Sequence, residues 1–186
     1  MKKVYLTVLF VLTLLLLSSC GGSSQTNIDN VPDWYLNTPS DPNYIFAPAQ
    51  SRSKSMQLAI DKATTDGRAE IAREIETKLE GLQKKFDEEV GVGEDAQLLQ
   101  QFTQANKTVV SNVLSGSSVI KKAVFEDDDL YEAYVLVQYP IGAASAEYMK
   151  QLEKTQAYTR FRASETFKEL EEEVKKYEEW KEKQGQ

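Results

Sequence analysis

The chain has 186 residues, enough for one domain with a hydrophobic core, and its 29 acidic and 22 basic residues give a net charge of −7 at pH 7. This acidic balance argues against nucleic acid as a partner. The chain contains no histidine, which excludes triads and zinc sites that depend on histidine. With a single cysteine it cannot form a disulfide within itself, so the fold must depend on packing.

Residues 1–19 have the pattern of a secretory signal peptide. Lys2 and Lys3 form a positively charged start, and an apolar stretch follows from Val4 to Leu17. A membrane-spanning helix needs about 20 apolar residues, and this stretch is shorter. We therefore expect residues 1–19 to be cleaved from the mature protein.

The apolar stretch ends in Leu17-Ser18-Ser19-Cys20, which resembles the lipobox of bacterial lipoproteins. In such proteins the cysteine sulfur receives a diacylglycerol, the chain is cut before the cysteine, and the new amine is acylated, for example with palmitate. Several acyl chains on one residue give lasting membrane attachment. We expect Cys20 to be the lipid attachment site, and we expect no cofactor apart from this covalent lipid. An ordinary secreted protein with a chance cysteine is the alternative.

Residues 20–30 are expected to form a flexible tether, because Gly21-Gly22-Ser23-Ser24-Gln25 is small and polar. No aspartate follows Cys20. In lipoproteins of the enterobacterial kind, an aspartate there retains the protein at the inner membrane, so the resemblance favours the outer membrane. Loss of Lys2 and Lys3 with the signal changes the net charge to −9.

The folded domain is expected at residues 31–140 and opens with Val31-Pro32-Asp33-Trp34-Tyr35. Pro39 and Pro42 keep this segment extended and irregular, so it should lie across the domain surface. We interpret Trp34 as an anchor whose ring is buried against the core. The alternative is that Trp34 and Tyr35 contact a partner.

A strand is predicted at residues 44–47, where Pro48 marks either its end or an edge position. The longest periodic pattern follows and predicts an amphipathic helix. Gly67 lies on its apolar face and would permit close approach to a sheet. The helix is longer than a small domain needs, so we expect a break near Gly81 and a projecting far end. The apolar face comprises Met56, Ile60, Ala63, Gly67, Ile71, Ile75, Leu79, Leu82, Phe86 and Val90.

A turn at residues 91–95 precedes a second helix, with Asp95 as its N-cap and Gly116 at its end. Its apolar face comprises Leu98, Phe102, Ala105, Val109 and Val113. Strands at residues 119–125 and 130–139 then form a hairpin around the turn at residues 126–129. The face of the second strand that should meet the helices comprises Tyr131, Ala133, Val135, Val137 and Tyr139.

The C-terminal segment, residues 141–186, is expected to be one amphipathic helix from about Ala143 toward Lys183. This pattern suits either packing along the domain or a coiled coil with another copy. The apolar positions are Ala163, Phe167, Leu170, Val174 and Tyr177. Together these elements predict an α+β fold, in which a small antiparallel sheet of one N-terminal strand and a hairpin is packed by long helices on one face.

Four segments together resemble the LPP-twenty family of bacterial lipoproteins, over roughly residues 32–137. They are the Val31–Tyr35 opening, the strand at residues 44–47, the helix residues Ala59, Ala63, Arg68 and Glu70-Ile71-Ala72, and the late strand Tyr131-Glu132-Ala133-Tyr134-Val135-Leu136-Val137. Gly67 stands where that family's helix usually has alanine, and Ala47-Pro48-Ala49 replaces a glycine-containing strand end. The resemblance implies an outer-membrane lipoprotein that assembles with itself or with other envelope proteins. Some members build the disc around the flagellar motor, and others are surface antigens.

We therefore expect a non-enzymatic envelope lipoprotein with a structural or interaction-mediating role. One alternative is a periplasmic lipoprotein that binds a small ligand or an ion. Residues 126–129 offer oxygen ligands suited to calcium, but they lack the spacing of an EF-hand loop. The other alternative is a hydrolase that uses two carboxylates, although nearly all carboxylates here fall opposite an apolar helix face.

Overall fold

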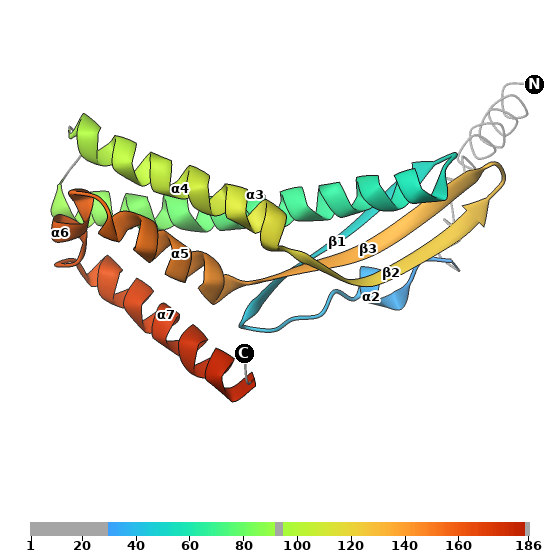
Figure 1. The fold of residues 1–186 in the computed structure, drawn as a ribbon. Helices are drawn as coiled ribbons and strands as arrows, with labels where there is room; N and C mark the ends of the chain where they lie inside the picture. The colour runs from blue at the N-terminus through green and yellow to red at the C-terminus, as the bar shows by residue number, and fades with distance from the viewer. Residues whose placement is uncertain (1–29, 92–94, 185–186) are drawn as a thin grey trace, which may run out of the picture. The chain divides into compact units, whose positions relative to one another are not determined.

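The computed structural model describes residues 30–91 and 95–184 of this chain. The predicted signal peptide, the lipobox and nearly all of the tether lie outside the described residues. The described part has the predicted α+β fold, with a three-stranded antiparallel sheet and a long C-terminal helix (Figure 1). Its elements in chain order are α2 (Asp33–Leu36), β1 (Tyr44–Ser53), α3 (Met56–Val90), α4 (Ala96–Gly116), β2 (Ser118–Asp127), β3 (Leu130–Pro140), α5 (Ile141–Glu153), α6 (Ala157–Phe161) and α7 (Glu165–Gln184).

The strand order is β1-β3-β2, so the last strand in sequence lies in the middle of the sheet. The predicted hairpin of β2 and β3 is confirmed, and β1 pairs with β3 from Tyr44 opposite Pro140 to Ser53 opposite Tyr131. Pro48 lies inside β1, opposite Leu136, so the prediction that the strand ends there is wrong. The edge position is confirmed, because an edge strand needs hydrogen bonds on one side only and tolerates a residue without an N–H.

Helix α3 is continuous over 35 residues, so the expected break near Gly81 is wrong. At 1.5 Å per residue it extends roughly 50 Å. Figure 1 shows one part of α3 over the sheet and the rest beside α4 and the C-terminal helices. The far end does not project, since Phe86 is fully buried. Packing at both ends outweighs the roughly 1 kcal/mol that a glycine costs inside a helix. Two residues of the predicted apolar face are exposed, Met56 at 51% and Val90 at 43%. They are the first and last residues of the helix.

Small residues bring α3 close to the sheet. Ala59 and Ala63 are fully buried, and Gly67 lies one helical turn further along. A Cβ atom on Gly67 would lie 2.6 Å from Val137 Cγ2 and 3.4 Å from the Ala47 carbonyl oxygen. The predicted close approach of the helix to the sheet at Gly67 is therefore confirmed.

Strand β3 is buried on both of its faces. The predicted inner face is confirmed, because Ala133, Val135 and Val137 are fully buried beneath α3. The outer-face residues Tyr134 and Leu136 are also buried. Helix α2 lies against β3, so the N-terminal segment crosses the sheet surface as predicted.

Helix α4 matches its prediction closely. The Asp95 side chain accepts a hydrogen bond from the Leu98 N–H at 3.1 Å, the helix ends at Gly116, and its whole predicted apolar face is buried. Its Phe102 ring packs 5.2 Å from Phe86 and 5.6 Å from Phe161, centre to centre. These rings form the core between α3, α4 and α6.

The C-terminal segment contains three helices where the sequence pattern predicts one. The chain turns between α5 and α6 and again between α6 and α7. These turns place Phe161 in the core and leave Ala163, predicted to be apolar-facing, exposed. Packing of α7 on its own domain buries Phe167 and Leu170. The Tyr177 side chain packs against Gly142 of α5 and occupies the space that a Cβ atom there would need. The described residues contain no helix that is both long and apolar enough to span a membrane.

A carboxylate from α3 caps the start of α7. Glu89 accepts hydrogen bonds from the N–H groups of Glu165 at 2.6 Å and Thr166 at 3.2 Å, and from the Thr166 hydroxyl at 3.1 Å. A negative charge at a helix N-terminus also interacts favourably with the helix dipole. Hydrogen bonds from the Glu165 backbone, and then from Thr166, lower the pKa of Glu89.

We expect Gly67→Ala to lower the free energy of unfolding by roughly 1–3 kcal/mol, because its methyl group would overlap Val137. Gly81→Ala is the matched control in the same helix, since a Cβ atom there meets nothing within 4 Å. This control should raise the free energy by up to about 1 kcal/mol. Urea unfolding measures both changes, and equal stabilisation by the two substitutions would contradict the close contact.

We expect Glu89→Gln to lower the free energy of unfolding at pH 7, with faster hydrogen exchange at the amides of Glu165 and Thr166. Because folding lowers the pKa of Glu89, its stabilisation is present above the unfolded pKa and is lost as pH falls through the folded pKa. Urea unfolding of the variant and the parent should therefore converge as pH falls below 4.5. Glu88→Gln, on the exposed neighbouring carboxylate, is the control. A gap that does not depend on pH would contradict the cap.

Candidate partner surface

The aromatic pair Trp34 and Tyr35 lies in α2, on the outer face of the sheet. The Tyr35 ring packs edge-on against Tyr134 of β3, with 5.0 Å between ring centres, and the Trp34 ring lies 6.4 Å from that of Tyr35. Both residues are only half-buried. The prediction that Trp34 is the buried anchor is therefore wrong, and Tyr35 makes the contact with the sheet.

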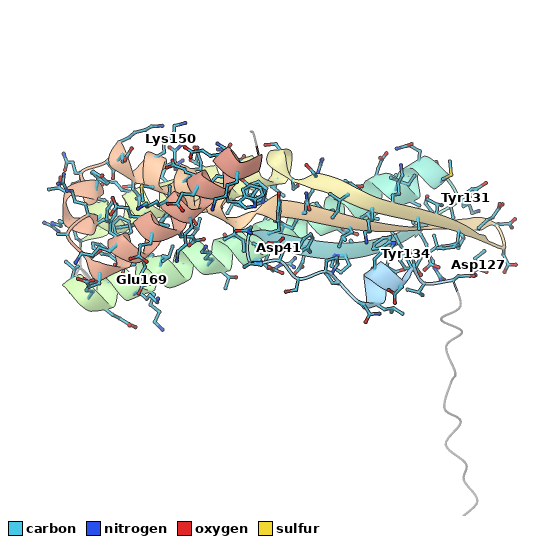
Figure 2. The ribbon with its side chains drawn as sticks, turned by 90° about the horizontal axis from the view of Figure 1, so that it is seen from below. Asp41, Asp127, Tyr131, Tyr134, Lys150 and Glu169 are labelled. Carbon is cyan, nitrogen blue, oxygen red and sulfur yellow. The ribbon has the colours of Figure 1, made fainter. Side chains whose placement is uncertain are left out.

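The same face carries an ion pair between the strands β1 and β3. Arg52 Nε donates to Glu132 Oε1 at 2.9 Å, and Glu132 is buried. Burial, and next the charge of Glu132, raises the pKa of Tyr134 above its ordinary value. Tyr134 therefore stays protonated at neutral pH. Figure 2 shows it beside α2, so it holds the N-terminal segment to the sheet.

Two carboxylic acids of the described residues have a raised pKa. Burial raises the pKa of Asp87, and burial with the nearby charge of Glu70 raises that of Glu74. Both lie on α3, thirteen residues apart, which corresponds to about 20 Å along a helix. Glycoside hydrolysis needs two carboxyl groups within about 10 Å. These two acids therefore do not form such a pair.

Two hollows on the described surface are lined by charges that already have partners. One of about 350 Å³ lies between α3 and α7, and its Glu169 and Glu173 form ion pairs with Lys85 and Lys78. Another of about 230 Å³ contains the ion pair of Arg160 and Asp95, at 3.0 Å. These contacts tie helices together rather than leave charges free for a ligand.

The hairpin turn that offers oxygen atoms for calcium is an ordinary two-residue turn in the structure. Asp127 pairs with Leu130, and Asp128 has a left-handed backbone with φ of 52°. Within residues 30–91 and 95–184, no three or more histidine, cysteine, aspartate or glutamate side chains are arranged to hold a metal ion.

Strand β2 forms the second edge of the sheet, and sequence reasoning did not identify it as a surface. It pairs with β3 on one side, and most of its residues are exposed. Lys121-Lys122 lie near its middle, and Glu126-Asp127 lie at its C-terminal end. This charge pattern is visible in the sequence, but its position at an edge is not.

Comparison of this chain with protein-family models, with curated proteins and with solved structures found no match.

We expect Tyr35→Ala to lower the free energy of unfolding by about 1–2 kcal/mol, because the ring contact with Tyr134 is lost. It should also make the segment at residues 31–42 more sensitive to limited proteolysis. Leu36→Ala is the control in the same short helix, because Leu36 is 55% exposed, and it should change stability by less than about 0.5 kcal/mol. Equal protease sensitivity in the two variants would contradict the anchoring role of Tyr35.

Proposed function

We propose that this chain is a lipid-anchored lipoprotein of the bacterial envelope, located at the outer membrane. Its role is structural or interaction-mediating. The observation that carries this proposal is Leu17-Ser18-Ser19-Cys20 at the end of a charged and apolar N-terminal stretch. That stretch is too short for a spanning helix and has the length of a signal peptide. The lipid on Cys20 would supply the membrane attachment.

The residues behind the LPP-twenty resemblance make structural contacts in the described domain. Ala59 and Ala63 are fully buried where α3 meets the sheet. The opening at residues 31–35 leads into α2 on the outer face, and residues 131–137 belong to the central strand β3. These residues shape the contact between helix and sheet rather than line a reactive site, which supports a scaffold role. Membership of the family is part of the proposal.

A scaffold role also agrees with the charges on the surface. The carboxylates of the hollow between α3 and α7 are paired with lysines, and the two acids with a raised pKa lie far apart on one helix. We therefore propose a non-enzymatic protein with no cofactor apart from the covalent lipid. Within the part of the chain that the structure describes, no cluster of side chains suited to a metal ion favours calcium.

The mechanism that we propose is tethering. A lipid on Cys20 confines the folded domain to a layer above the membrane, and the short polar segment after it lets the domain reorient. Confinement raises the effective concentration of neighbouring copies or of other envelope proteins. Contacts that are weak in solution then become sufficient for assembly.

We expect Cys20→Ala to abolish incorporation of labelled palmitate and to remove the protein from the outer-membrane fraction. The physical reason is that the variant has no sulfur to carry the diacylglycerol. Without the lipid, the proposal leaves nothing to hold the polar domain at the membrane. Ser23→Ala, in the segment after the cysteine, is the control and should leave both readouts unchanged. An unmodified Cys20 in the N-terminal peptide of the parent protein, seen by mass spectrometry, would overturn the proposal.

A further inference from the structure

The two edges of the sheet differ in their readiness to accept another strand. Edge strand β1 has Pro48 in its middle, which removes one backbone donor. Edge strand β2 has no proline and is regular from Lys121 to Asp127, because its one irregularity lies between Val119 and Lys121. Seven consecutive residues at this edge are therefore shaped to pair.

The charges on β2 select which strand can pair with it. Lysines on an edge repel most incoming strands. Here Lys121 and Lys122 lie at the start of the regular part, and Glu126 and Asp127 lie at its end, all four exposed. A parallel copy of β2 would oppose lysine to lysine. An antiparallel copy brings each lysine toward a carboxylate, and opposite charges across a strand pair are stabilising.

Backbone geometry restricts the register of such a pair. Residues directly opposite each other in an antiparallel pair point their N–H and C=O groups either both toward or both away from the other strand. These groups alternate along β2, so two copies can pair only about a central residue that faces itself. Centring on Ala123 places the lysines opposite Val124 and Phe125, and centring on Phe125 places them opposite the hairpin turn. Centring on Val124 places Lys122 opposite Glu126 and Lys121 opposite Asp127.

We propose that β2 is a self-association edge, at which two copies of this chain pair antiparallel through residues 121–127 about Val124. The pair joins the two sheets into one of six strands, with a two-fold axis at Val124. A seven-residue strand pair is a small interface, so this inference rests on the proposed membrane tethering, which raises the concentration of copies. The partner is a second copy because β2 carries its own complementary charges.

The test uses Val124→Cys in the full-length chain, expressed in intact bacterial cells and treated with a short bis-maleimide. Cβ atoms of directly opposed residues lie about 5 Å apart, so a cross-linked dimer is expected. The parent chain shows the background from Cys20, and Lys107→Cys, an exposed site on α4, shows the background from crowding. No dimer at position 124 above these two backgrounds would overturn the inference.

Charge exchange then tests the register. In the Val124→Cys chain, adding either K121E/K122E or E126K/D127K places like charges opposite each other, which should weaken dimerisation about tenfold or more. Coexpression of these two variants should restore the cross-link, because every opposed pair between them is again of opposite charge. Restoration also shows that both variants fold. The matched control K62E/K107E makes the same charge change on α3 and α4 and should leave the dimer intact.

Dimers that persist in each variant alone, or that do not return on coexpression, would overturn the pairing. Fractionation of the same cells reports separately on the anchor. Protein in the membrane fraction without a cross-link at position 124 refutes the β2 inference and leaves the lipid anchor standing. Protein absent from the membrane fraction refutes the anchor, whatever the cross-linking result.

Discussion

The fold depends on the close contact between α3 and the sheet. This one helix extends roughly 50 Å and packs on β1 and β3 over one part and on α4 over the other. Over the sheet its contact residues are small, and a single methyl group at Gly67 would overlap Val137. Beyond the sheet they are large, ending in Phe86 among the rings of Phe102 and Phe161. The change from small to large residues along one helix face lets the same helix pack closely on the sheet and also contribute large side chains to the helical core.

The C-terminal helices complete that helical core and return the chain to the sheet. Glu89 caps the first turn of α7, Lys78 pairs with Glu173 further along, and the Trp180 ring lies 5.5 Å from that of Tyr44 at the start of β1. These contacts join α7 to α3 and to β1. Figure 2 shows Glu169 of α7 and Lys150 of α5 in the helical part of the molecule, away from the hairpin end marked by Asp127. Helix α7 therefore packs on its own domain, and its acidic face is the side exposed to solvent.

Surfaces rather than clefts are the basis of the proposed function. The charged side chains in the hollow between α3 and α7 neutralise one another, and Tyr134 holds the N-terminal segment in place. Edge β2 keeps its backbone groups and four charges exposed. A weak strand pair is of little use to a freely diffusing protein. It would become effective between copies that share a membrane surface, which links the proposed lipid on Cys20 to the proposed pairing edge of the sheet.

The sequence alone determined the features that depend on neighbouring residues. Periodicity located α3, α4 and the hairpin, Asp95 was identified as a cap, and Gly67 as a point of close approach, because each follows from local spacing. The lipobox at Cys20 is also a local pattern, and it stays a prediction. Tertiary structure decided what depends on distant partners. Pro48 continues a strand because β1 is at an edge, and Tyr35 rather than Trp34 meets the sheet because Tyr134 lies there. Phe161 is buried and Ala163 exposed because two turns divide the C-terminal segment. Periodicity records which face of an element is apolar, but only the packed structure determines which strand is left at the edge.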